Sequence, residues 1–215
     1  MKLLALETAN EQCSVCIVED GTVKFNGFNE QPRAQTQTLL PMIEQGLQQT
    51  DLTLEQLDVI AFSRGPGSFS GVRINAAVTQ ALAWANDIPV APVSTLQALA
   101  QAAYRLHGLT AVTAVLDARM KEVYIASYEL DQNKIMQPVS EEKLLAYDIA
   151  QNEIKHTLVG SGAPLLQKDA LLTVIADAQD IATIAQTAPT VEASHALPVY
   201  LRDNAWKKIS EQGKA

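Results

Sequence analysis

The stretch IAFSRGPGSFSGVRINAA (residues 60–77) reads as the end of an apolar strand, a glycine turn and the start of a helix. Backbone N–H groups at a helix N-terminus of this kind commonly bind phosphate. Gly65 and Gly67 flank a proline, which predicts a turn, and Ser68 or Ser70 can cap the helix that follows. The stretch is therefore a candidate phosphate site.

Three motifs that would give this turn a definite chemistry are not met. A P-loop needs a lysine after its last glycine, and no lysine follows Gly71. A Rossmann fingerprint needs a third glycine where Ser70 stands. A hydrolase elbow needs a central serine, and Phe69 holds that position in GSFSG. The turn offers backbone N–H groups without a motif residue.

Twice in the chain, an apolar strand-like stretch ends in an acidic residue. Glu7 stands in LALETANEQCSVCIVEDG, and Asp117 stands 110 positions later in AVLDARMKEVYIASYELD, which has the same layout of strand, acid, polar turn and strand. The same offset carries Cys13 onto Val123. A repeat of such long period predicts two similar lobes, with both acids at equivalent hairpin turns facing the cleft.

Hairpins followed by strands that alternate with helices predict an α/β architecture with mixed sheets flanked by helices. A second glycine turn, with Gly160 and Gly162, follows a strand-like stretch in the second half. We expect an N-terminal lobe over residues 1–104 and a smaller C-terminal lobe over residues 105–215. The last helix of the second lobe is expected to pack back on the first.

Two cysteines form a C-x-x-C pattern that invites a redox or zinc interpretation. Cys13 and Cys16 lie in a strand-like stretch, where residues three apart point to opposite faces. Zinc would need two further ligands, and His107, His156 and His195 stand isolated in the sequence. We expect buried, reduced cysteines and no metal.

Composition sets limits on the class of protein. The chain has 215 residues, of which 47% are hydrophobic and 19% charged, as in an ordinary globular protein. Its formal net charge of −8 argues against unaided binding of RNA or DNA, which needs a basic surface. No apolar run is long enough to span a bilayer, so we expect a cytoplasmic protein that does not contact membranes.

Two helical segments predict a partner-binding surface. The segment 71–87 is apolar on nearly every side, so we expect it to be buried all round, which at a domain surface requires a partner. The alternative is that one chain covers both of its faces. The segment 36–47 has an apolar stripe, with Pro41 early in the helix or kinking it. The predicted partner-binding residues are Leu39, Leu40, Ile43, Leu47, Val72, Ile74, Ala77, Val78, Ala81 and Trp84.

Four stretches carry a resemblance to a known family: LALETANEQCSVCI, GPGSFSGVRI, LDARMKEVY and the C-terminal PVYLR. In this order they resemble the TsaB (YeaZ) family of the actin/sugar-kinase/Hsp70-like superfamily. The resemblance implies a two-lobed, actin-like fold with duplicated ribonuclease-H-like sheets. It also implies a role in making threonylcarbamoyladenosine in tRNA, on the adenosine next to the anticodon.

The resemblance implies a non-catalytic subunit that activates TsaD, the related subunit that transfers threonylcarbamoyl to tRNA. Members with the enzyme activity carry a His-x-x-x-His metal pair where this chain has Thr95 and Leu99. We therefore expect a homodimer when the chain is alone and a heterodimer with TsaD. TsaE and tRNA are expected to be reached only through that complex.

The resemblance also implies that the glycine turn is an inherited scaffold. In ATP-using members the first hairpin acid helps to orient magnesium; the family commonly has Asp there, whereas this chain has the longer Glu7. We expect no resident cofactor, with ATP or ADP bound only weakly or at a partner interface. The residues of this vestigial nucleotide-like site are Glu7, Gly65, Gly67, Ser68, Asp117, Arg119, Gly160 and Gly162.

Two other functions compete with the scaffold hypothesis. The two acids and the two glycine turns would also suit a small ATPase or kinase of actin-like fold, for which magnesium-dependent ATP turnover by the isolated chain is the test. A peptidase would need a base or a ligand set beside a nucleophile, and no motif surrounds the three histidines.

Overall fold

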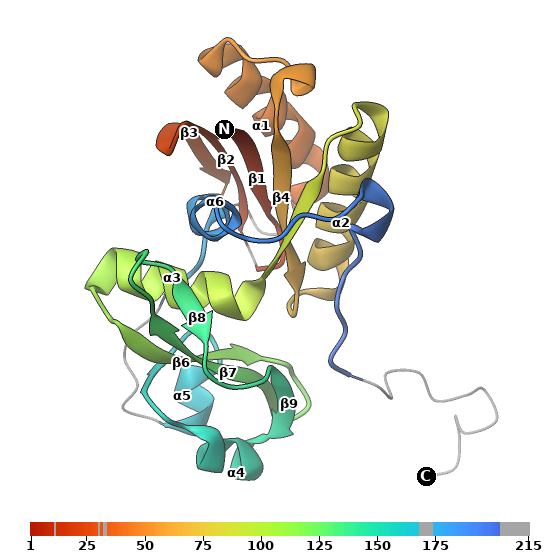
Figure 1. Cartoon of the computed structure of the whole chain (residues 1–215). Helices are drawn as coiled ribbons and strands as arrows, with labels where there is room; N and C mark the ends of the chain where they lie inside the picture. Colours follow the sequence, from red (N-terminus) through yellow and green to blue (C-terminus); the bar gives the residue numbers. More distant parts are fainter. Residues whose placement is uncertain (11, 30, 32–33, 168–173, 203–215) are drawn as a thin grey trace, which may run out of the picture.

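Two five-stranded mixed sheets organise the chain (Figure 1). The computed structural model describes residues 1–202 except 11, 30, 32–33 and 168–173. The WKK stretch that follows position 205 lies outside the described residues. None of the described helices combines the length and the apolar character needed to cross a membrane.

The first sheet has the order β3-β2-β1-β4-β5. Its strands β1, β2 and β3 are antiparallel neighbours, and β4 and β5 run parallel to β1. Helices α1 and α2 cover one face, and α3 and α6 cover the other. The strands are β1 Lys2–Glu7, β2 Cys13–Glu19, β3 Thr22–Asn29, β4 Val59–Gly65 and β5 Val90–Ser94, and the helices are α1 Gln35–Thr50, α2 Phe69–Ala85, α3 Thr95–His107 and α6 Ala178–Ala185.

The second sheet has the order β10-β6-β7-β8, and β9 also pairs with β7. Strands β6 and β7 form an antiparallel hairpin, and β10 runs parallel to β6. The elements are β6 Ala111–Asp117, β7 Glu122–Leu130, β8 Met136–Pro138, β9 Lys143–Ala146, β10 Thr157–Val159, α4 Tyr147–Ala150 and α5 Ala163–Leu166. Three short 3-10 turns complete the description: η1 Leu54–Gln56, η2 Gln151–Glu153 and η3 Ala193–His195.

The predicted repeat is present, but its second half is offset by one residue. Glu7 and Asp117 each end the first strand of a hairpin, which confirms that the two acids hold equivalent places. Glu7 pairs with Ser14, whereas Asp117 pairs with Val123. Ser14, and not Cys13, is therefore the counterpart of Val123, because the first hairpin connection is one residue longer.

The cysteines confirm the prediction of opposite strand faces. Cys13 belongs to the core beneath α1 and α2, and Cys16 belongs to the core beneath α3 and α6. Both are free and buried. Burial raises the pKa of Cys16 to about 12, so its thiol stays protonated and a poor nucleophile.

Helix α3 contacts both sheets, and α6 returns from the second half of the chain to pack on β1 and β2 (Figure 1). The sequence-based boundary between residues 104 and 105 falls inside α3. The division into lobes at that position stays a prediction, since one helix belongs to the core of both halves.

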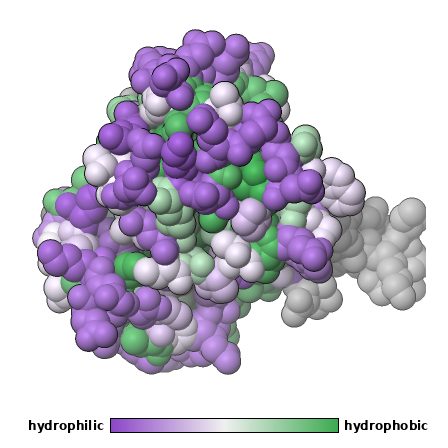
Figure 2. Space-filling model, turned by 45° about the horizontal axis from the view of Figure 1, so that its top comes forward, coloured by the Kyte–Doolittle hydropathy of each residue, from purple (hydrophilic) through white to green (hydrophobic). Residues whose placement is uncertain are grey.

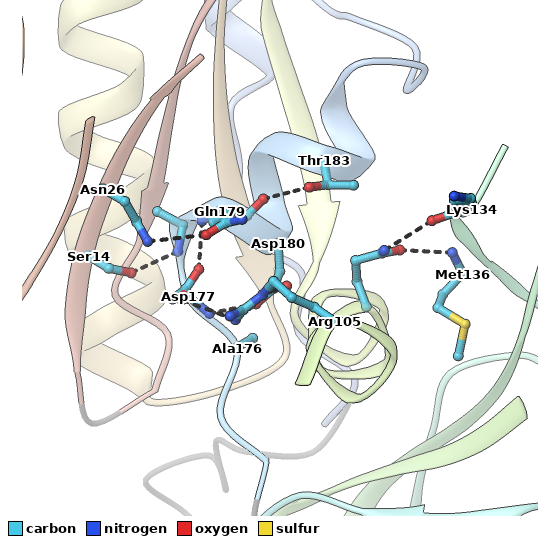
Figure 3. Close-up of polar contacts among 12 residues, drawn as sticks. Ser14, Asn26, Arg105, Lys134, Met136, Ala176, Asp177, Gln179, Asp180 and Thr183 are labelled. Atoms are coloured by element: carbon cyan, nitrogen blue, oxygen red, sulfur yellow. Dashed lines mark hydrogen bonds and ion pairs between the residues drawn. The ribbon is translucent and has the colours of Figure 1, made fainter. Parts of the chain in front are cut away.

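A buried ion pair joins α3 to α6 (Figure 3). Arg105 donates to both carboxylate oxygens of Asp180, each over 2.8 Å, and also to Asp177 over 3.1 Å. Asp180 is fully buried, and burial raises its pKa to about 6, which leaves it ionised at neutral pH. The neighbouring Ala178 N–H donates to Ser14 Oγ of β2 over 2.9 Å. The second half is thereby tied to the first sheet.

Arg105→Met is expected to destabilise the chain by about 3–5 kcal/mol at pH 7.5, because it leaves the Asp180 carboxylate buried and unpaired. The loss should shrink near pH 5, where Asp180 takes up a proton, and the added exchange Asp180→Asn should recover part of it at pH 7.5. Urea unfolding at both pH values measures these differences. An equal loss at both pH values would show that Arg105 acts through packing and not through charge.

Candidate functional site

The glycine turn between β4 and α2 is closed by the chain itself. Ser68 caps α2 by accepting from the Gly71 N–H, which confirms it as the N-cap. The connection between β1 and β2 lies against this helix start: the Ser68 N–H donates to Ala9 O over 2.7 Å, and Thr8 Oγ1 donates to Gly71 O over 2.8 Å. A peptide carbonyl therefore lies where a phosphate would approach the turn.

Two glycines are required by this contact. A Cβ at Gly67 would lie 2.5 Å from Ala9 O, and a Cβ at Gly71 would overlap the Thr8 carbonyl. Side chains at either position would push the first hairpin away from α2. The two glycines thus serve backbone packing.

Glu7, the first hairpin acid, is buried beneath the contact between the first hairpin and α2. Glu7 is fully buried, and its Oε1 accepts from the Ala9 and Asn10 N–H groups. Burial raises the pKa of Glu7 to about 7, against the opposing effects of the Ser63 hydroxyl and these N–H groups. Its Oε2 has no hydrogen-bond partner among the described residues, and neither does the buried Asn75 Oδ1.

The second hairpin acid holds its own turn in the same way. Asp117 Oδ1 accepts from the Arg119 N–H over 2.8 Å, just as Glu7 accepts from the residue two positions on. The Arg119 side chain pairs with Asp117 Oδ2 over 3.0 Å. The neighbouring glycine turn is also used internally, since the Gly162 N–H donates to Val115 O. Within the described residues no hydrogen bond or ion pair joins Glu7 to Asp117.

The positions that correspond to the His-x-x-x-His pair belong to the core. Thr95 and Leu99 lie one turn apart on α3, and both are buried. Leu99 packs so closely on Gly160 that a Cβ there would overlap the leucine side chain. Within the described part of the chain, no group of three or more His, Cys, Asp or Glu side chains could hold a metal ion.

The structure corrects the predicted partner-binding surface. Leu39, Ile43 and Val72 are at most 4% exposed and belong to the core between the helices and the first sheet, so they cannot form the outer face. The alternative that one chain covers both faces of α2 is wrong for the described residues, so burial of this helix on all sides would require a partner. Trp84 is 69% exposed, and Ala77 and Ala81 of the same outer face are exposed.

The remaining predicted residues lie where the two helices meet the surface. Leu40 of α1 is 53% exposed, while Leu47, Ile74 and Val78 are half-buried. Beside them runs a groove of about 390 Å³ between α1, η1 and α2, lined with leucines and rimmed by polar side chains. Figure 2 shows a largely hydrophilic surface on which hydrophobic residues gather in separate patches. We define the outer stripe of α2 as Ala77, Ala81 and Trp84. These three exposed residues form an apolar face that no other described residue covers.

The comparisons with known proteins give first the class and then the family. A family model described as "TsaD: tRNA N6-adenosine threonylcarbamoyltransferase" matches residues 29–157, which places the chain in the class of actin-like, TsaD-like folds. A solved Pseudomonas aeruginosa structure, described as similar to peptidase YeaZ, superposes with a TM-score of 0.84 at 36% identity and covers 94% of this chain and 99% of that one. This confirms the predicted fold class.

Two curated relatives carry the name "tRNA threonylcarbamoyladenosine biosynthesis protein TsaB". The Escherichia coli protein is 40% identical and the alignment covers 97% of this chain and 98% of the relative. The Haemophilus influenzae protein is 36% identical, with 97% of each chain covered. The chain belongs to the TsaB family.

Sequence reasoning missed the contacts of the C-terminal segment. Arg73 of α2 lies 3.6 Å from the Phe69 ring centroid and donates from Nε to the Tyr200 hydroxyl over 2.8 Å. Arg202 pairs with Glu122 of the second hairpin over 2.6 Å. The PVYLR stretch gives no indication of partners that lie 80 or more positions away in the sequence.

Glu7→Gln is expected to remove a pH-dependent loss of stability. Folded Glu7 takes up its proton near pH 7, against 4.5 as the ordinary value, so the wild type should lose on the order of 3 kcal/mol relative to the variant as the pH rises from 5 through 8. Urea unfolding at pH 5, 6.5 and 8 tests this, with the same exchange at exposed Glu44 as the matched control. A difference between variant and wild type that stays constant across these pH values would contradict the expectation.

Proposed function

We propose that the chain is a non-catalytic subunit that binds TsaD and activates the transfer of threonylcarbamoyl to tRNA. Membership of the TsaB family supports this function, since curated relatives are named for threonylcarbamoyladenosine biosynthesis. The match to the TsaD model supports a partner of the same fold.

The observation that carries the proposal is the uncovered outer stripe of α2. Trp84 is 69% exposed beside the exposed Ala77 and Ala81, and small side chains allow another helix to approach closely. A solvent-exposed tryptophan on an apolar helix face is typical of a protein interface, where aromatic residues supply much of the binding free energy. The groove beside α1 adds further apolar area to this face.

A small ATPase or kinase is disfavoured by the closed glycine turn. Glu7 is buried under its own connection, and the Ser68 N–H is bonded to Ala9 O. Magnesium-bound nucleotide could reach this acid only if the first hairpin moved off α2. Nucleotide bound at the interface with a partner remains part of the proposal.

A peptidase is disfavoured by the geometry around the histidines. Ser194 Oγ lies 3.3 Å from His195 Nδ1, but both residues are exposed neighbours in η3. No carboxylate among the described residues is hydrogen-bonded or paired to His195. A nucleophile, a base and an orienting group are therefore not assembled there.

Self-association and TsaD binding are proposed to compete for the same face of α2. TsaE and tRNA are proposed to join through the complex with TsaD and not through this chain alone. The competition follows from geometry, because one helix face cannot be covered by two partners at once.

Omitting the chain from a reconstituted system that contains TsaD, TsaE and the enzyme that forms the threonylcarbamoyl-adenylate is expected to abolish tRNA threonylcarbamoylation while formation of the adenylate continues. Nucleoside analysis of the tRNA and assay of the adenylate measure the two steps separately. Unchanged modification without the chain would refute the proposed function.

Ala77→Glu or Ala81→Glu is expected to give a folded monomer that binds TsaD at least 100-fold more weakly. A carboxylate placed in a dry interface without a partner costs several kcal/mol, and each 1.4 kcal/mol is about tenfold in affinity. Leu106→Glu, at a half-exposed position of α3 on the opposite face of the first sheet, is the matched control. Light scattering and calorimetric titration with TsaD measure both effects; normal dimerisation and binding by both variants would place the interface elsewhere.

A further inference from the structure

The turn between β6 and β7 has an unusual backbone. Arg119, Met120 and Lys121 are three successive residues with φ of 62°, 55° and 61°. This left-handed region favours glycine and asparagine, and a side chain with a Cβ is strained in it. Yet all three positions carry long side chains, so the sequence accepts strain that small turn residues would avoid.

The strained turn presents its side chains to solvent. Met120 is 81% exposed, and the Arg119 side chain is exposed to the same extent. Nothing within the described chain covers Met120 beyond a long contact from Arg202 Nη1 to its sulfur, at 3.8 Å. Backbone strain that gains no packing inside the chain points to a use outside it.

The C-terminal segment connects this turn to α2. Arg202 donates to Ala118 O over 3.1 Å and pairs with Glu122, so it braces both ends of the turn. Three residues before it, the Val199 N–H donates to Arg64 O at the end of β4 over 2.7 Å. Tyr200, between them, accepts from Arg73 of α2.

Arg73 and its two aromatic neighbours extend the outer stripe of α2, and the C-terminal segment runs from them to the turn between β6 and β7. Arg73 lies one helical turn before Ala77, and it is held between the rings of Phe69 and Tyr200, at 3.6 Å and 5.5 Å from their centroids. Phe69 is 53% exposed and Tyr200 is 48% exposed. We name the surface formed by Phe69, Arg73, Arg119, Met120 and Tyr200 the cross-lobe patch.

We propose that the cross-lobe patch is a second contact for the partner subunit that binds α2, with Met120 inserted into an apolar pocket of that partner. The inference rests on the proposed function and extends its interface from the first half of the chain to the second. Aromatic residues, methionine and arginine are the types enriched at the centres of protein interfaces. A stable interface also buries roughly 800 Å² on each partner, and one helix face needs such an extension to reach it.

The charges of the patch favour a protein over RNA. Arg119 is paired with Asp117, and Arg202 is paired with Glu122, at 3.0 and 2.6 Å. Arg73 and Lys121 have no ion-pair partner among the described residues, but two such cations neutralise few phosphates, and the whole chain has a net charge of −8. An apolar anchor with paired arginines around it fits a pocket whose rim carries a few carboxylates.

The test compares four variants in titration with TsaD: Met120→Glu, Met120→Leu, Ala77→Glu and the control Leu106→Glu. We expect Met120→Glu to weaken TsaD binding at least tenfold without changing the melting temperature or the dimerisation of the free chain. Met120→Leu should bind within twofold of the wild type, and Leu106→Glu should bind normally. Hydrogen exchange should show residues 118–121 protected in the complex.

Any other outcome overturns the inference, and the measurements distinguish these outcomes from one another. If Ala77→Glu abolishes binding and Met120→Glu does not, the partner contacts α2 alone and the proposed function stands. If the wild type does not bind TsaD, the proposed function fails and the inference fails with it. Loss of dimerisation in Met120→Glu would assign the patch to a second copy, and loss of tRNA retention with TsaD affinity unchanged would assign it to RNA.

Discussion

The contact between the first hairpin connection and the start of α2 fixes most of what the first half of the chain can do. The Ala9 carbonyl accepts from the N–H of Ser68 at the N-cap, and the Thr8 hydroxyl donates to the Gly71 carbonyl in the first turn of the helix. Glu7 is buried because this connection folds over it. The same contact sets the position of α2 on the sheet and hence which of its sides faces outward. Closing the glycine turn and fixing the outward side of α2 are two consequences of this one contact.

The two hairpin acids have the same structural role. Glu7 and Asp117 end equivalent strands, and each accepts a backbone N–H from the residue two positions later. A carboxylate that holds its own turn is occupied, and Glu7 has the extra methylene that lets Oε1 also reach the Asn10 N–H. The Glu7 carboxylate thus orders the loop that follows it. Its second oxygen has no hydrogen-bond partner among the described residues, and burial of the carboxyl group raises its pKa.

The local sequence pattern was sufficient to predict the features that depend on residues close together in the sequence. The hairpin acids, the Ser68 cap and the opposite faces of Cys13 and Cys16 follow from strand and helix periodicity, and the structure has all of them. The rotation of α2 could not be predicted, because a helix with apolar residues on nearly every side gives no preferred inward face. Contacts between residues far apart in the sequence could not be predicted either. Arg105 and Asp180 lie 75 positions apart, and each taken alone reads as an ordinary surface charge.

The shared use of α3 by both sheets bears on how a partner could act on this chain. A helix that belongs to two cores transmits displacement between them, since packed cores deform little. The Arg105–Asp180 pair fixes α3 to α6 on one side of the molecule, and the segment from Val199 to Arg202 ties β4 to the second hairpin on the other. These two ties hold the halves together at separate places. A partner that rests on both halves would then bind a surface that is already ordered, so little conformational entropy need be lost on association. A scaffold subunit whose task is to hold another protein in an active arrangement benefits from this rigidity, whereas a nucleotide-driven machine of the same fold needs its halves to move.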